Sequence, residues 1–80
     1  MFNLRSLDLN LLTVFEAIYE LGSVSGAADR LALSQSAASQ QVHEIEKRLG
    51  IALFDRTTRP LLLTQAGKIY LDFCRDVLRR

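Results

Sequence analysis

The fold of this chain is decided by the stretch AADRLALSQSAASQQVHEIEKRLG, which runs from residue 27 to residue 50. Apolar side chains over residues 24–31 recur at helical spacing and predict a short helix, with Ser25 as its candidate N-cap. Ser34 is well placed to cap a second helix over residues 35–49. Two helices joined by a turn of about three or four residues are the outline of a helix-turn-helix.

Helical periodicity is also present before and after this stretch. Residues 11–19 predict another helix, which Asp8 would cap and Gly22 would end, and which would complete a three-helix core. A last helix is predicted to begin after Thr64, and no glycine or proline ends its pattern before Arg80. Its apolar residues are Ala66, Ile69, Tyr70, Phe73 and Val77.

The segment between the last two helices has a different pattern. Residues 51–56 and 61–63 are short runs compatible with β-strands, and they flank the turn sequence Thr57-Thr58-Arg59-Pro60. We therefore expect a β-hairpin with its proline at the turn or the edge. Arg56 and Arg59 would put two cations on this hairpin. They belong either to a solvated loop in which Asp55 is the charge partner, or to a wing that lays arginine into or beside a DNA minor groove.

The helix over residues 35–49 is predicted to have two distinct faces, at about 100° per residue. The apolar face consists of Ala38, Val42, Ile45 and Leu49. The opposite face consists of Ser36, Gln40, His43 and Lys47, with Ser39 at its edge. Hydroxyl and amide groups suit the reading of base edges in DNA, although a merely solvated helix face is the plainer alternative. We interpret His43 as a surface histidine rather than a DNA contact.

The composition limits the classes of function. The 80 residues are 49% hydrophobic and 24% charged, which is typical of one small globular domain. One cysteine and one histidine leave no disulfide and no ordinary zinc site, and we expect Cys74 to be a packing residue. No signal peptide or membrane-spanning segment is predicted, which favours the cytoplasm. No catalytic constellation or phosphate-binding loop is found, so we expect neither an enzyme nor a cofactor.

The formal net charge of +1 hides an uneven distribution. Residues 1–50 hold four cations and six anions, whereas residues 51–80 hold six cations and three anions. A polyanion would therefore have to bind locally, because the chain as a whole attracts it only weakly.

Five motifs together resemble the LysR-type transcriptional regulators. They are AADRL at 27–31, SQSAAS at 34–39, IExxLG at 45–50, LFxRxxR at 53–59 and LTxAG at 63–67. The resemblance spans essentially the whole chain in order and spacing. It implies a mainly α, winged helix-turn-helix fold, with a three-helix core and a short β-hairpin wing.

The resemblance also implies a domain organisation. Residues 1–63 would form the DNA-binding domain, and residues 64–80 the start of a linker helix that pairs two chains. Family members carry a C-terminal effector-binding domain of roughly two hundred residues, which this chain lacks. We therefore interpret the sequence as a piece of a longer regulator.

Residue roles follow position by position from the resemblance. Gln35, Ser36 and Ser39 match residues that face the major groove or its phosphates. Arg59 matches the wing residue that enters the minor groove, and Arg56 matches a basic wing position.

Three further residues complete the candidate set. Gln40 stands where many family members carry arginine, and its amide suits adenine. Ser25 and Ser34 are expected first as helix caps, a role compatible with phosphate binding. The candidate DNA-binding residues are thus Ser25, Ser34, Gln35, Ser36, Ser39, Gln40, Arg56 and Arg59.

The predicted function is sequence-specific binding of double-stranded DNA at an interrupted inverted repeat. The chain would act as a homodimer through Tyr70, Phe73 and Val77, or as a tetramer when full length. A small-molecule inducer is expected only on the missing domain, and no membrane contact is expected. The alternative is a winged-helix module for protein docking, with an all-helical dimerisation domain as a weaker third. Docking gives no reason to combine an arginine-bearing hairpin with an uncharged Ser/Gln face.

Overall fold

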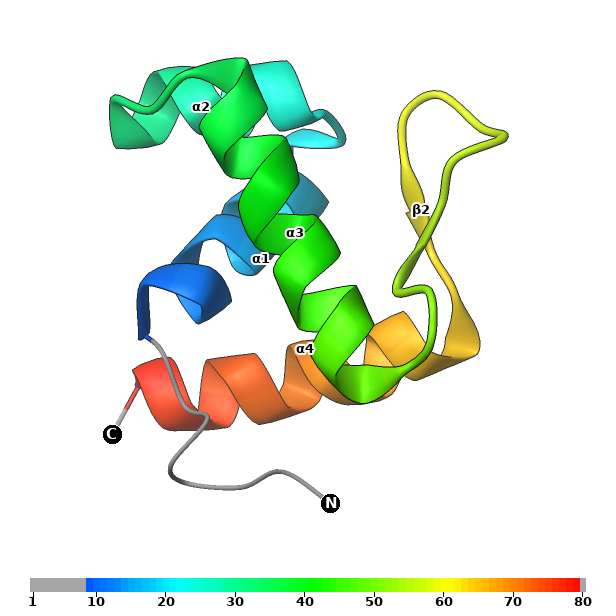
Figure 1. Cartoon of the computed structure of the whole chain (residues 1–80). Helices are drawn as coiled ribbons and strands as arrows, with labels where there is room; N and C mark the ends of the chain where they lie inside the picture. Colours follow the sequence, from blue (N-terminus) through cyan, green and yellow to red (C-terminus); the bar gives the residue numbers. More distant parts are fainter. Residues whose placement is uncertain (1–8, 80) are drawn as a thin grey trace.

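The computed structural model describes residues 9–79, and the expected cap Asp8 lies outside them. The described residues form four helices and one two-stranded sheet (Figure 1). In chain order these are α1 (Leu9–Leu21), α2 (Val24–Leu31), α3 (Gln35–Leu49), β1 (Phe54–Asp55), β2 (Leu62–Leu63) and α4 (Gln65–Leu78). The predicted mainly α fold with a hairpin between the third and fourth helices is confirmed.

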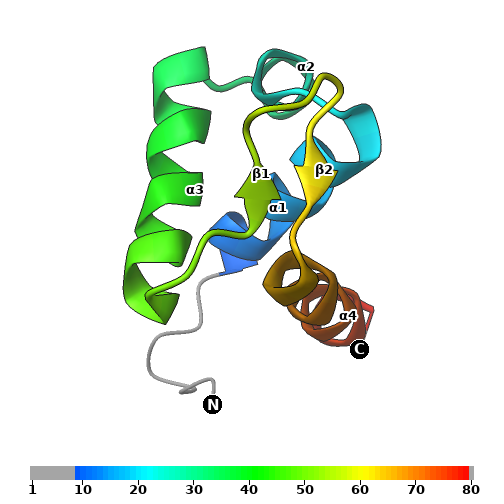
Figure 2. The same cartoon turned by 90° about the vertical axis from the view of Figure 1, so that its right-hand side faces the viewer.

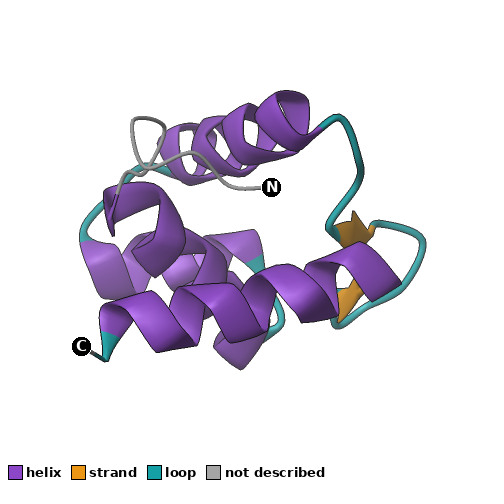
Figure 3. Ribbon diagram, turned by 90° about the horizontal axis from the view of Figure 1, so that it is seen from below, coloured by secondary structure: helices purple, strands orange, loops and turns teal. Residues whose placement is uncertain are grey.

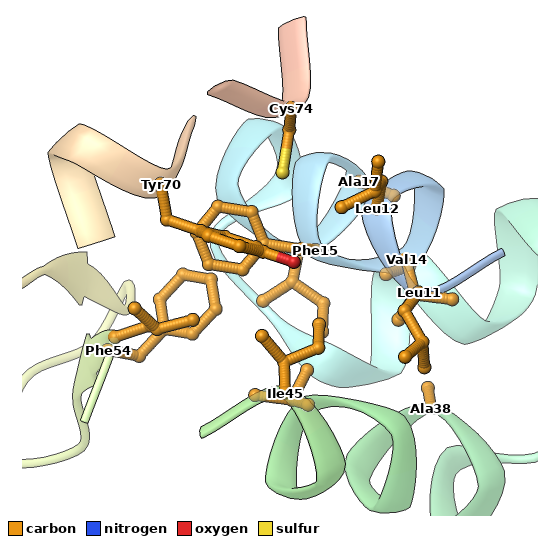
Figure 4. Close-up of a cluster of buried hydrophobic side chains, with 14 of the residues drawn as sticks. Leu11, Leu12, Val14, Phe15, Ala17, Ala38, Ile45, Phe54, Tyr70 and Cys74 are labelled. Atoms are coloured by element: carbon orange, nitrogen blue, oxygen red, sulfur yellow. The ribbon is translucent and has the colours of Figure 1, made fainter. Parts of the chain in front are cut away.

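The core is built around Phe15, whose side chain is fully buried in the middle of α1. Its ring centroid lies 5.0 Å from that of Phe54 in β1 and 5.1 Å from that of Tyr70 in α4 (Figure 4). The Tyr70 ring meets it edge-on, which is a favourable aromatic geometry. Ala38 and Ile45 close the core from α3. The three helices, the hairpin and α4 therefore share one hydrophobic core.

Hydroxyl side chains cap three of the helices. Ser34 accepts a 3.0 Å hydrogen bond from the amide of Ala37, and Thr64 caps α4 in the same way, so both predicted caps are confirmed. The prediction for α2 is wrong, because its N-cap is Ser23, whose hydroxyl accepts from the amide of Gly26 at 2.9 Å. Ser23 has the extended backbone that a cap requires, whereas Ser25 already lies inside the helix.

The turn between α2 and α3 spans residues 32–34, as the helix-turn-helix prediction requires. Ala32 adopts a left-handed conformation with φ of 57°. The amide of Leu33 donates a 2.9 Å hydrogen bond to the carbonyl of Ala28, which satisfies the end of α2. The reversal is therefore closed by backbone hydrogen bonds, and it lets α2 lie across the N-terminal end of α3 (Figure 1).

The hairpin is shorter than predicted. Antiparallel pairing joins Phe54 to Leu63 and Asp55 to Leu62, whereas residues 51–53 are not part of a strand. The backbone of residues 51 and 52 forms hydrogen bonds with residues at the end of α3 and the start of α4 instead. The amide of residue 51 donates to the carbonyl of Glu46 at 3.2 Å, and the Thr64 hydroxyl donates to the carbonyl of residue 52 at 2.7 Å.

Helix α4 lies against α1 at the end of the molecule away from α2 (Figures 1 and 3). Its buried side chains include Tyr70, Leu71 and Cys74, so the expected packing role of Cys74 is confirmed. Tyr70 is only 6% exposed, because it packs against Phe15, and it does not belong to an uncovered stripe. Ile69, one of the apolar residues of this helix, is 60% exposed.

Candidate nucleic-acid interface

The polar face of α3 forms one continuous surface. The side chains of Gln35, Ser36, Ser39, Gln40 and His43 line a single shallow, open groove along it. Ser39 is half-buried and the other four are exposed, which the helical periodicity predicted for Ser36, Gln40 and His43. On the opposite face, Ala38, Val42 and Ile45 are buried in the core. Core packing therefore fixes which face of α3 is presented to a partner.

The start of α3 adds backbone donors to this surface. The first amides of a helix have no carbonyl partner within it, and they attract phosphate. At this end the hydroxyl of Ser34 is occupied by the amide of Ala37, so Ser34 acts in the structure as a cap. Ser25 is exposed in the first turn of α2 and takes no part in that helix's cap.

The wing, defined here as residues 54–63, carries Arg59 at its exposed turn. The Arg59 Nη1 donates to the carbonyls of Arg56 at 3.1 Å and Thr58 at 2.8 Å. Within residues 9–79, no carboxylate oxygen lies within 4.0 Å of the Arg59 guanidinium. Figure 1 shows the wing turn and the N-terminal end of α3 at the same end of the molecule, opposite α4. The positive charge of Arg59 is therefore carried at the end of the molecule where α3 begins.

Asp55 orders the base of the turn. Its carboxylate accepts hydrogen bonds from both the amide and the hydroxyl of Thr57. These bonds hold the pKa of the Asp55 carboxyl below its ordinary value. Asp55 is therefore a turn-forming residue, and it is not the charge partner that the solvated-loop alternative gave the wing arginines.

Arg56 pairs with a carboxylate of α3. Its Nη2 donates to Oε1 of Glu46 at 2.8 Å and its Nη1 donates to Oε2 of Glu46 at 3.1 Å. This two-point contact is the strong geometry of an arginine–carboxylate pair. The structure therefore turns Arg56 towards α3 and separates it from Arg59 at the turn.

Glu46 is the site residue that the sequence did not single out. Its side chain is 11% exposed, and Oε2 also accepts from the amides of Leu53 at 2.7 Å and Phe54 at 3.4 Å. Burial raises the pKa of Glu46, but the hydrogen bonds from Arg56 and the two amides outweigh burial and hold the pKa below its ordinary value. Its only sequence signal was its place in the IExxLG motif, since a contact between residues ten positions apart has no local signature.

Residues 9–79 contain neither a metal-binding cluster nor a membrane-spanning helix. No group of three His, Cys, Asp or Glu side chains there is arranged to hold a metal ion. Across the same residues, every helix falls short of the length and apolar character needed to cross a membrane.

The family comparison decides what this arrangement is. The model of the bacterial regulatory helix-turn-helix proteins of the lysR family matches residues 9–68. The chain belongs to the LysR family. It is a LysR-type helix-turn-helix DNA-binding domain, and the predicted resemblance is confirmed.

Individual relatives agree with this assignment. The chain is 45% identical over 69 residues to the uncharacterized HTH-type transcriptional regulator y4mQ of Sinorhizobium fredii, covering 86% of this chain and 23% of that protein. It is similar to the crystal structure of VV2_1132, a LysR family transcriptional regulator, with a TM-score of 0.86, 34% identity, and coverage of 91% of this chain and 27% of that one.

A second solved structure contains DNA. The chain is similar to the BenM DNA-binding domain in its complex with catB site 1 DNA, with a TM-score of 0.87 and 33% identity. The match covers 91% of this chain and 82% of the BenM domain. By contrast, the chain spans less than a quarter of the length of the curated relatives that it matches.

Proposed function

We propose that this LysR-type domain binds duplex DNA with the polar face of α3 in the major groove and the wing at the adjacent minor groove. The observation that carries the proposal is that Arg59 and the α3 groove lie at one end of the molecule, on separate elements. Gln40 would read a base edge, while Gln35, Ser36 and Ser39 would contact bases or phosphates. The similar BenM domain was solved on DNA, which supports this arrangement.

The charges of the domain favour recognition that depends on sequence. The polar face of α3 has no charged side chain among Gln35, Ser36, Ser39 and Gln40, and the formal net charge of the chain is +1. Such a domain gains little from phosphate attraction alone, so base contacts and two-fold symmetry would supply much of its affinity.

We propose that the domain acts as a dimer on an interrupted inverted repeat, with α4 as the start of the helix that pairs two chains. Tyr70 is buried and therefore cannot belong to the dimerisation surface, so we place the exposed Ile69 there instead of Tyr70. Ile69, Phe73 and Val77 are spaced four residues apart and so follow one helix face. Half-sites would then lie about one helical turn apart, or a multiple of it.

Salt dependence of DNA affinity tests the proposed binding. Duplexes selected from a random pool by the domain would be titrated at several salt concentrations. We expect affinity to fall steeply as the logarithm of salt rises, because bound phosphates release counterions. Binding that is insensitive to salt, or absent at low salt, would favour the alternative of a protein-docking module.

Sedimentation tests the dimer. We expect the domain to show concentration-dependent dimers and the variant Ile69→Glu to stay monomeric, because a charge on the apolar stripe opposes its burial. Lys68→Glu, exposed on the same helix but about 100° around it from Ile69, is the control. A monomeric parent domain at high concentration would contradict the proposed pairing.

We also propose properties for the whole regulator that contains this domain. It would couple DNA binding to a small-molecule inducer held by a further domain, would work in the cytoplasm, and would catalyse no reaction. The length of the curated relatives, more than four times the matched segment, supports the presence of such a domain. A thermal-shift screen of the full-length regulator against small molecules tests for it.

A further inference from the structure

We infer that Glu46 is a positioning residue for DNA recognition, because it sets the wing at a fixed orientation to α3. This inference rests on the proposed function. Glu46 would not touch DNA itself. It would act through Arg56 and the base of the wing, so that Arg59 reaches its groove while α3 lies in the neighbouring one.

Glu46 adds polar contacts between α3 and the wing to the core packing that the two elements share. It lies on α3, one turn after His43, the last residue of the polar groove. Its carboxylate binds the guanidinium of Arg56 and the amides of Leu53 and Phe54. These groups belong to residues 53–56, the segment that leads into the wing and is called here its incoming leg. Four donors thus converge on one helix side chain, and they fix the position and the rotation of this leg.

The same carboxylate also faces the polar groove. The Nδ1 atom of His43 lies 4.0 Å from Oε1 of Glu46, the oxygen that accepts from Nη2 of Arg56. Oε1 of Glu46 therefore lies near His43 on the polar face of α3 and also binds Arg56 of the wing. A shift of the wing relative to α3 would therefore disturb the pair formed by Glu46 and Arg56.

The hairpin also has anchors that do not involve the Glu46 carboxylate. The amide of Leu61 donates to the carbonyl of Gly22 at 3.1 Å, and the amide of Thr64 donates to the carbonyl of Leu53 at 3.0 Å. Loss of the Glu46 carboxylate would therefore leave the hairpin attached to the domain. We expect its incoming leg to gain freedom, rather than the domain to unfold.

Arg56 takes its role from the same geometry. Both of its Nη atoms are bound to Glu46, and Nη1 also lies 3.4 Å from the carbonyl of Phe54. Contact with a phosphate would require at least one of these charge-assisted hydrogen bonds to break. Arg56 therefore belongs with Glu46 in holding the wing, whereas Arg59 is the wing cation that faces outward.

A double-mutant cycle separates positioning from mere stability. Arg59→Ala would be measured in three backgrounds: the parent domain, Glu46→Gln and Glu44→Gln. Glu44 is a matched control, because it lies on the same helix and pairs with Arg48 within that helix at 2.9 Å. The readouts are the dissociation constant for a selected duplex and its salt slope.

We expect Arg59→Ala to weaken binding about tenfold in the parent and Glu44→Gln backgrounds, with a salt slope smaller by about one unit. In the Glu46→Gln background we expect Arg59→Ala to weaken DNA binding further by less than about twofold and to leave the salt slope unchanged. The reason is that a displaced wing no longer places Arg59 at the minor groove. Equal effects of Arg59→Ala in all three backgrounds would overturn the inference.

Arg56→Gln provides a second variant should Glu46→Gln fail to fold. It removes the ion pair and leaves the amide contacts to Glu46 in place, and we expect the same loss of the Arg59 effect. NMR order parameters of the free domain add a readout without DNA. We expect lower values at Thr57 and Thr58 and unchanged values along α3, and unchanged values in the wing would overturn the inference.

The two proposals fail differently. Absence of DNA binding by the parent domain refutes the proposed function, whereas the order parameters still report whether Glu46 holds the wing. Normal DNA binding with fully additive effects of Glu46→Gln and Arg59→Ala refutes only the positioning role.

Discussion

The amide of Leu61 donates a 3.1 Å hydrogen bond to the carbonyl of Gly22, and this contact ties the wing to the turn between α1 and α2. Figure 2 shows how close the two segments lie. At Gly22 the backbone has φ of 70°, and an added Cβ would lie 2.6 Å from the Cβ of Pro60. Both the conformation and the close approach therefore require glycine here.

Gly50 allows these two requirements to be separated. It has nearly the same φ, 71°, but an added Cβ there meets no atom within 4 Å. We expect Gly50→Ala to lower the free energy of unfolding by about 1 kcal/mol, the cost of a left-handed conformation. Gly22→Ala should cost about 1–3 kcal/mol more, because Pro60 has to move. Urea unfolding measures both, and equal losses would contradict the steric role of Pro60.

Ala32 is the left-handed residue that is not glycine, and it lies exposed in the helix-turn-helix turn. We expect Ala32→Gly to raise the free energy of unfolding by about 0.5–1 kcal/mol, because glycine adopts this conformation without a clash of Cβ. Ala52→Gly is the control, since residue 52 is also exposed but has no positive φ to relieve. Thermal unfolding of the two variants checks the prediction, which fails if both lose stability alike.

Gln40 projects from the exposed face of α3, where its amide could pair with one base. We expect Gln40→Ala to reduce the preference at one base pair by about 1–3 kcal/mol, while other positions keep theirs. The measurement is binding to every single-base-pair variant of a selected site. Gln65→Ala on α4 should leave the preferences unchanged. A loss of equal size on every duplex would make Gln40 a backbone contact.

Arg59 is the exposed wing cation, and its guanidinium donates to backbone carbonyls of the wing instead of to a carboxylate. We expect Arg59→Ala to weaken DNA binding and to reduce the salt slope by about one unit, because one counterion fewer is released. Lys68→Ala removes the same charge from α4, where Lys68 lies beside Tyr19 and Leu62, and it should leave the slope unchanged. Fluorescence anisotropy titrations provide both slopes, and an unaltered slope for Arg59→Ala would remove this residue from the interface.

Cys74 is fully buried, and burial raises the pKa of its thiol to about 12. Since only the thiolate reacts, alkylation of the folded domain at pH 8 should be at least about a hundredfold slower than in denaturant. The folded state retains this proton over a pH range in which the unfolded state loses it. The contribution of Cys74 to stability should therefore be constant below about pH 9 and fall between about pH 9 and 12. Rapid alkylation of folded protein would contradict this burial.

Much of the helical framework and of the recognition face could be predicted from the sequence, because the signals are local. Apolar residues at helical spacing predicted which face of α3 is buried, and Ser34 and Thr64 were recognised as caps. Such features depend on residues within a few positions of one another. The resemblance to the LysR family rests on the same kind of information, since its motifs are short and lie in order along the chain.

What only the tertiary structure decided were choices between neighbouring residues and contacts between distant ones. Ile69 and Tyr70 are both apolar and differ by about 100° around α4, so periodicity alone could not choose between them. The choice is made where the helix packs: a Cβ at Gly67 would overlap the carbonyl of Leu53, so α4 meets the hairpin base closely and turns Tyr70 onto Phe15.

The contacts of the wing are decided in the same way. Arg56 pairs with Glu46 and not with Asp55, because the chain reverses at Gly50 and the base of the hairpin then packs against α3. By itself, the sequence determined the helices, the caps of α3 and α4, the polar face of α3 and the family. The docking of α4 and the orientation of the wing depended on packing between distant segments, which no short-range pattern encodes.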